Sequence, residues 1–128
     1  MMSDISPVVI SGKKILNLTP HPVTVILEGG MHITIPASGT VARVSQKETI
    51  VSQLGSIPIV RVEYGKVEGL PKPEDVDYVI VSTMVASALA QSPEWKGKVL
   101  VPNSGPTTLG VVRDEKGNII GVKSLILY

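Results

Sequence analysis

The sequence predicts an α+β fold made mostly of antiparallel β hairpins and a β meander, with one short helix in a β-α-β crossover. Three observations predict it. Apolar and polar residues alternate along the N-terminal half, a strand–helix–strand pattern follows, and a polar turn separates two apolar runs at the C-terminus. The 128 residues are 43% hydrophobic and 18% charged, which is enough apolar material for a core. We therefore expect a single globular domain over residues 1–128.

The meander is expected in the first third of the chain. Four segments alternate in the manner of half-buried strands, and breakers containing proline or glycine separate them: residues 14–18, 23–27, 31–35 and 40–44. The glycine pair at 29–30 can adopt positive φ in a tight turn. Short connections of this kind predict antiparallel neighbours.

Residues 45–55 match two different patterns. Ser45 and Glu48 have the spacing of a helix capping box, and Gly55 stands where a helix would end. The β-branched run at 49–51 favours a strand instead. We favour a hairpin, in which Pro58 must lie at an edge or a bulge because it has no N–H to donate.

The crossover is expected in the second half. Residues 76–81 end as a strand that is apolar on both faces, Ser82-Thr83 can cap a helix over residues 84–91, and residues 98–101 form another short apolar strand. A strand, a helix and a strand in this order favour a right-handed connection between parallel strands.

The C-terminal segment predicts a hairpin. Residues 109–112 and 119–127 are apolar and flank a polar turn that contains Gly117. Arg113 lies beside Asp114 and Glu115 in this turn, so we expect it to form an ion pair there rather than to bind an anion.

Composition excludes several classes of function. The absence of cysteine excludes disulfides and thiolate chemistry, and a net charge of +1 with 3% aromatic residues makes nucleic-acid binding an unfavoured role. No apolar run approaches the roughly 18 residues of a membrane span, and residues 1–7 lack the layout of a secretory signal. We therefore expect no membrane association. Nucleotide-binding glycine motifs are absent as well, and we assign no cofactor.

His21 is the most unusual candidate residue. It stands between Pro20 and Pro22, which restrict its backbone, so an imidazole on this stiff turn is placed to donate a hydrogen bond or exchange a proton. The alternative is that Thr19 and His21 only stabilise the turn. His32 alternates with apolar residues, and its spacing from His21 matches no metal motif, so we expect no metal site.

The remaining candidates are expected at strand ends. Ser82 and Thr83 stand between a strand and a helix, where unpaired N–H groups favour an anion, although they can equally be simple caps. If the two strands are parallel, Asn103 reaches the same edge of the sheet. Arg43 lies among apolar neighbours and is either an ion-pair partner or an anion clamp.

The chain resembles a group of small uncharacterised proteins of bacteriophages, prophages and archaeal viruses that carry an N-L-T-P-H motif. The matching pieces extend in order over most of the sequence: residues 17–21, 42–44, 57–60, 65–71, 78–82, 85–88 and 112–117. The resemblance implies a hairpin over residues 45–60 and a shared site for His21, Arg43 and Ser82. It implies no activity, and the segment at 95–98 departs from the pattern. With the absence of cysteine, it implies a location in the host-cell cytoplasm, or alternatively in the virion.

Two functions follow from these expectations. In the first, a strand-end pocket binds a small anion such as a nucleotide or a phosphorylated metabolite through His21, Arg43, Ser82, Thr83 and Asn103, with catalysis left open. In the second, the protein has a structural or interaction role and forms a homo-oligomer through unpaired sheet edges. No residue is assigned a catalytic role.

Overall fold

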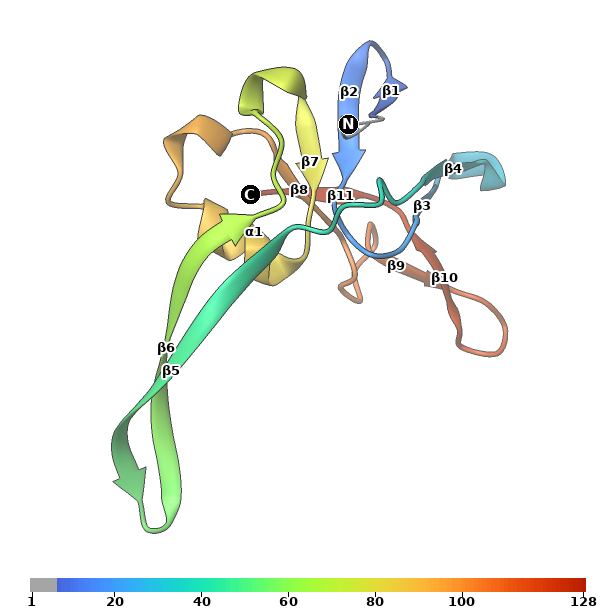
Figure 1. Cartoon of the computed structure of the whole chain (residues 1–128). Helices are drawn as coiled ribbons and strands as arrows, with labels where there is room; N and C mark the ends of the chain where they lie inside the picture. The colour runs from blue at the N-terminus through green and yellow to red at the C-terminus, as the bar shows by residue number, and fades with distance from the viewer. Residues whose placement is uncertain (1–6) are drawn as a thin grey trace.

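The computed structural model describes residues 7–128, so the segment inspected for a secretory signal lies largely outside it. Strands dominate, and one α-helix is present among the described residues (Figure 1). The strands are β1 (Val8–Ile10), β2 (Lys13–Asn17), β3 (Val23–Ile26), β4 (His32–Ile35), β5 (Arg43–Leu54), β6 (Ile57–Glu68), β7 (Tyr78–Ile80), β8 (Val99–Pro102), β9 (Val111–Arg113), β10 (Ile119–Val122) and β11 (Leu125–Leu127). The helix is α1 (Thr83–Leu89), and three short 3₁₀ turns are Glu28–Gly30, Pro73–Asp75 and Pro93–Trp95. The predicted α+β class is confirmed.

The strands of residues 7–128 form three sheets. The first has the order β1-β2-β7-β8-β11, with β2, β7 and β8 parallel and the two edge strands antiparallel to their neighbours. The second has the order β4-β3-β10-β9, in which β3 and β10 run parallel. The third is a two-stranded ribbon of β5 and β6, which projects from the body and which we call the arm (Figure 1).

The alternation of side chains along the first sheet places it between two cores. Leu16, Val79 and Val99 face α1, which contributes Val85, Ala86 and Leu89 to the same cluster. Ile15 and Ile80 face the second sheet and pack against Val23 and Ile35. The central strand β7 is thus covered on both faces, as its continuous apolar run predicts.

The β-α-β crossover is confirmed. Strands β7 and β8 pair in parallel, and α1 begins directly after β7. The Ser82 hydroxyl accepts a hydrogen bond from the Val85 backbone N–H at 3.3 Å, so it caps the helix as expected. Residues 95–98 have a structural role, because Trp95 is buried and Lys98 Nζ donates to the carbonyls of Pro73 and Val76.

The prediction of an N-terminal meander is only partly confirmed. The β3–β4 hairpin forms, but β2 pairs with β7 rather than with β3. The reason is the connection after β2, in which Pro20 and Pro22 offer no N–H to a ladder and direct the chain into the second sheet. The fourth expected strand is also displaced, since Ala42 instead donates to Leu18 O and Arg43 begins the arm.

Residues 45–55 form a hairpin, as the β-branched run predicts. Leu54 and Ile57 are register partners, which leaves Gly55 and Ser56 as a two-residue loop, and Gly55 adopts φ +62°. Pro58 lies opposite Gln53 in a ribbon whose two strands are both edges, so its missing donor is tolerated.

The C-terminal hairpin of β9 and β10 is confirmed, but the second apolar run is divided. The chain crosses at Lys123 and Ser124 from the second sheet to the first, where β11 pairs with β8. The expected ion pair of Arg113 is replaced by a hydrogen bond from its guanidinium to Gly117 O at 2.8 Å.

Asp114 organises the β9–β10 turn instead. Its carboxylate accepts from the backbone N–H groups of Asn118 and Lys116, and the Asn118 bond is the main cause of a pKa below the usual 3.8. Because this pKa is lowered by folding, the Asp114 carboxylate stabilises the folded turn at pH values above the pKa that the same carboxyl has in the unfolded chain. This contribution is lost as the pH falls through the lowered value.

We expect Val79→Ala to lower the free energy of unfolding by about 2–3 kcal/mol, because it removes two methyl groups from a fully buried site in the core between the first sheet and α1. Urea denaturation measures this loss. The matched control is Val9→Ala on β1, where the side chain is 61% exposed and the loss should stay within about 0.5 kcal/mol. Equal losses at the two positions would contradict the central placement of β7.

Candidate functional site

The turn after β2 is organised by a buried amide. Asn17 is 1% exposed and is the buried polar side chain of the described core. Its Nδ2 donates to His21 O at 2.9 Å and to Ile35 O at 3.1 Å, and its Oδ1 accepts from the Thr19 N–H at 3.0 Å. The Thr19 hydroxyl donates to Asn17 Oδ1 at 2.7 Å or to His21 O at 2.9 Å. The amide therefore uses its oxygen and one N–H within the turn and its other N–H on the end of β4.

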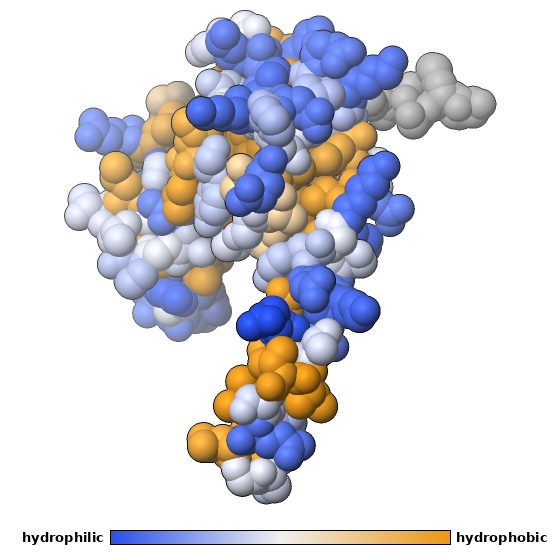
Figure 2. Space-filling model, turned by 90° about the vertical axis from the view of Figure 1, so that its left-hand side faces the viewer, coloured by the Kyte–Doolittle hydropathy of each residue, from blue (hydrophilic) through white to orange (hydrophobic). Residues whose placement is uncertain are grey.

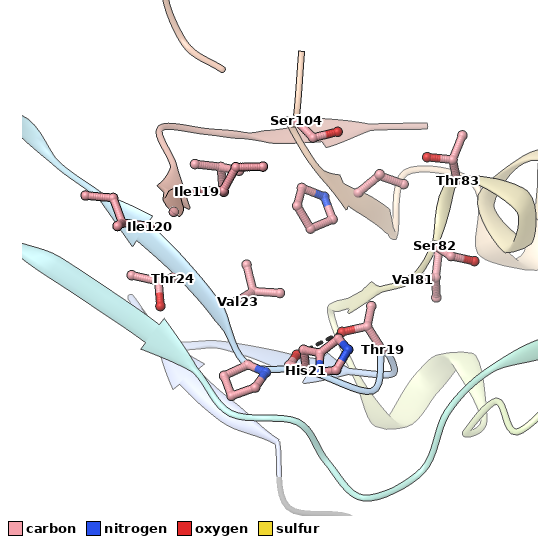
Figure 3. Close-up of a pocket in the computed structure, with 15 residues that line it drawn as sticks. Thr19, His21, Val23, Thr24, Val81, Ser82, Thr83, Ser104, Ile119 and Ile120 are labelled. Atoms are coloured by element: carbon pink, nitrogen blue, oxygen red, sulfur yellow. Dashed lines mark hydrogen bonds between the residues drawn. The ribbon is translucent and has the colours of Figure 1, made fainter. Parts of the chain in front are cut away.

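His21 contributes to this network only through its backbone carbonyl. Any residue supplies that group, so the turn does not require an imidazole. The side chain is exposed and lines a pocket between the two sheets (Figure 3). We expected, as the alternative, that Thr19 and His21 stabilise the turn. The Thr19 side chain does so through its hydroxyl, whereas the His21 imidazole makes no hydrogen bond in this network.

The pocket has a volume of about 500 Å³ and lies where the ends of β7 and β8 meet the second sheet (Figure 3). Most of the residues that line it are apolar, and the others include threonine and serine residues, which carry hydroxyl groups. The lining residues are Thr19, His21, Pro22, Val23, Thr24, Val81, Ser82, Thr83, Val101, Pro102, Ser104, Ile119, Ile120, Gly121 and Val122. None of them is an aspartate, glutamate, lysine or arginine, so His21 is the lone titratable side chain in this lining.

Three of the five candidate residues come together at this pocket. His21 arrives from the turn after β2, and Ser82 and Thr83 arrive from the junction between β7 and α1. The Ser82 oxygen accepts a hydrogen bond from the Val85 N–H, and the Thr83 hydroxyl faces the pocket region (Figure 3).

Arg43 and Asn103 do not line the pocket. Arg43 is exposed at the base of the arm, where its register partner is Glu68. The Asn103 amide donates to Leu109 O and Ser124 Oγ, both at 3.1 Å, and its oxygen accepts from the Gly105 N–H. Asn103 therefore closes a loop, and its neighbour Ser104 takes the place at the pocket that we expected for Asn103.

The sequence reasoning also missed the wall formed by the second sheet. Thr24, Ile119 and Ile120 reach the pocket because β10 pairs in parallel with β3, and Gly121 allows the close approach. A Cβ at Gly121 would lie 2.8 Å from Thr24 O. This glycine inside an apolar run was the available indication of close backbone contact.

The arm is a second candidate site. Its apolar side chains are exposed and gather on its outer half, apart from the body (Figure 2). They are Ile50, Val51, Leu54, Ile57, Ile59, Val60, Val62 and Tyr64.

The register divides these residues between the two sides of the ribbon. Val60, Val62 and Tyr64 alternate along β6 and share one side with Ile50, the partner of Val60. We call these four residues the apolar face of the arm. Leu54 and Ile57 are partners on the opposite side, at the end of the ribbon. We call residues 53–57 the arm tip.

Residues 7–128 contain no cluster of three or more histidine, aspartate or glutamate side chains arranged to hold a metal ion. In the same part of the chain, no helix has the length and hydropathy needed to cross a membrane.

Comparison with known proteins gives no match to a family model, to a curated protein or to a solved structure. The pocket and the arm are therefore the two features from which we infer a function.

We expect Asn17→Asp to lower the free energy of unfolding by about 3 kcal/mol. The change is isosteric, but it replaces the donor facing His21 O and Ile35 O with a buried oxygen that repels both carbonyls. Thermal and urea denaturation measure the effect. Gln91→Glu makes the same chemical change at an exposed position and should cost little. A stable Asn17→Asp protein would show that the amide does not organise the turn.

Proposed function

We propose that this protein has a structural or interaction role and that it self-associates, with the arm of each copy packed against another copy. The observation that supports the proposal is the arm itself: twelve residues in each strand, with eight large apolar side chains exposed. Contiguous apolar surface of this kind marks interaction sites on soluble proteins. The viral-type role implied by the N-L-T-P-H resemblance belongs to the same proposal.

The arm lacks a partner within its own chain over most of its length. Val44 and Val67 at its base pack on the core, and Gln46 Nε2 lies 2.8 Å from Met84 Sδ of α1. Beyond this base every arm residue is exposed. A two-stranded ribbon is marginally stable in water without a third strand or a packed face, so a partner that covers it also stabilises it.

The energetics favour an arrangement in which every copy both gives and receives an arm. Complete burial of one Val, Leu or Ile side chain stabilises by about 1.5–3 kcal/mol, so covering eight half-exposed side chains contributes roughly 6–12 kcal/mol. Association costs about 4–15 kcal/mol. The burial of one arm is therefore of the same size as the cost of one association, and closed assemblies that bury an arm for every copy are more stable still.

The charges of the arm favour a second copy as the partner. Four basic residues (Arg43, Lys47, Arg61 and Lys66) and three acidic residues (Glu48, Glu63 and Glu68) lie along β5 and β6. Copies therefore do not repel one another. The arm offers no strongly charged surface of the kind that recruits nucleic acid or a highly charged protein.

The anion-binding hypothesis has less support. It retains His21, Ser82 and Thr83 at the pocket, but Arg43, its intended anion clamp, lies at the arm base. An apolar pocket without a lysine or arginine offers little to hold a phosphate. The exposed arm is the stronger of the two observations, and we assign the function to it.

We expect wild-type protein to form a defined oligomer and the double variant Ile50→Glu/Val60→Lys to be monomeric. The two positions are register partners, so the new charges pair across the ribbon and preserve it while the apolar face is lost. Light scattering coupled to size-exclusion chromatography measures the mass, for which a monomer gives 13.6 kDa.

The matched control is Val9→Lys, which places a charge on a valine of edge strand β1 that is as exposed as Ile50. It should leave the oligomer intact. A wild-type protein that is monomeric at tens of micromolar would refute the proposal. Loss of assembly in the control, with retention in the arm variant, would refute the assignment to the arm.

A further inference from the structure

We infer that the pocket between the two sheets is the acceptor site for the arm tip of a second copy of this chain. This inference rests on the proposed function and adds the place where the arm binds. It assigns to the pocket a peptide ligand of stated chemistry: an uncharged β-turn with two apolar side chains.

The arm tip has the chemistry of an apolar anchor. Residues 49–60 contain no aspartate, glutamate, lysine or arginine, although every one of them is exposed to solvent. Leu54 and Ile57 are 67% and 60% exposed and lie side by side as register partners. The two-residue loop between them keeps the end of the ribbon narrow.

The pocket has the matching character. Its lining contains no acidic or basic residue apart from His21, and valine, isoleucine and proline side chains form its walls. Its volume of about 500 Å³ lies in the range of sites that hold a compact ligand. Ile119 and Ile120 are exposed at its edge, where an entering apolar residue would cover them (Figure 3).

The polar groups of the two surfaces can also satisfy one another. The turn at Gly55 and Ser56 presents backbone N–H and C=O groups that a two-stranded ribbon cannot pair internally. The Thr24, Thr83 and Ser104 hydroxyls line the pocket and can donate or accept. Burial of the tip therefore need not leave its backbone groups unpaired.

Other concave surfaces match the tip less well. The pocket beside Trp95 and Tyr128 includes Lys96, and the smaller pocket at the arm base includes Lys66 and Glu94. An uncharged tip would have to bury or displace those charges, which costs free energy. Charge character thus favours the pocket between the sheets.

The placement of tip and pocket requires two chains. At about 3.3 Å per residue, twelve-residue strands carry the tip roughly 40 Å from the arm base. The arm points away from the body that contains the pocket (Figure 1). Donor and acceptor are therefore different surfaces, and such a heterologous contact builds a ring if its rotation closes and an open chain if it does not.

The test uses two variants of the full chain. Leu54→Lys/Ile57→Glu removes the apolar tip while placing opposite charges on partner positions, and Ile119→Lys/Ile120→Glu charges the pocket edge at two exposed positions. Each variant alone should be monomeric, with the dissociation constant raised by at least about tenfold. Mixed together they should form a complex of two chains, because one supplies an intact pocket and the other an intact tip.

Two controls accompany the mixture. Leu109→Lys charges an exposed leucine that does not line the pocket and should assemble like wild type. Circular dichroism should show that both double variants keep the wild-type fold, and Thr24→Lys serves as a second pocket variant if Ile119→Lys/Ile120→Glu unfolds.

The failures of the two proposals are distinguishable. If the pocket variants assemble like wild type while Ile50→Glu/Val60→Lys does not, the arm functions in assembly but the pocket is not its acceptor. If both monomeric variants fail to pair when mixed, the inference is also overturned, since the interface is then symmetric. Wild-type protein that is monomeric overturns both proposals.

The competing occupant is a small anion. Inorganic phosphate or AMP that raises the melting temperature of the tip variant, whose pocket is open, but not of the pocket variant would overturn the inference in favour of a ligand site. Equal melting temperatures with and without these probes support the arm tip as the occupant.

Discussion

The buried amide of Asn17 determines how the two sheets of the body are joined. It lies at the end of β2, and its hydrogen bonds reach the turn at Thr19 and His21 and the last residue of β4. Removing so polar a group from water is favourable only when its partners are all in place, so the amide selects one path for the chain. That path leads from the first sheet to the second. The pocket, with His21 at its edge, is the space left at this junction.

The pocket and the arm tip share a property that is uncommon on protein surfaces, because neither contains a formal charge. Charged residues make up 18% of the chain, yet they are absent from residues 49–60 and from the pocket lining. Water covers both surfaces in a single chain. Contact between copies would remove it from both at once, and the hydrophobic effect would then act where no ion pair has to be desolvated.

The sequence predicts the local elements of this fold well, because their determinants are neighbours in the chain. The loop at Gly55, the polar turn before Gly117 and the Ser82 cap each specify an element within a few residues. The partner of β2 is different. Residues 14–18 alternate in a way that suits a hairpin with β3 or a parallel pairing with β7, and the choice depends on residues about sixty positions away.

The candidate site could be predicted in part for the same reason. The prolines beside His21 indicated a stiff turn, and Ser82 and Thr83 stand at a helix start wherever β7 is placed. Arg43 was expected at the same site because of the resemblance, but it lies at the base of the arm, where β5 leaves the body. Asn103 and Ser104 are consecutive residues after β8, and their side chains point to opposite sides. Ser104 lines the pocket, whereas Asn103 bonds to Leu109 and Ser124. Sequence alone does not fix which of the two side chains points to the pocket.

The arm is inserted between β4 and β7, and beyond its base it contributes nothing to the core. Substitutions in its outer half are therefore free of the packing constraints that limit change in the body. If copies associate through the arm, as we propose, their recognition of one another can diverge among descendants of this gene without loss of the fold. Two related chains in the same cell would then sort into separate assemblies through a few residues at one end of a ribbon.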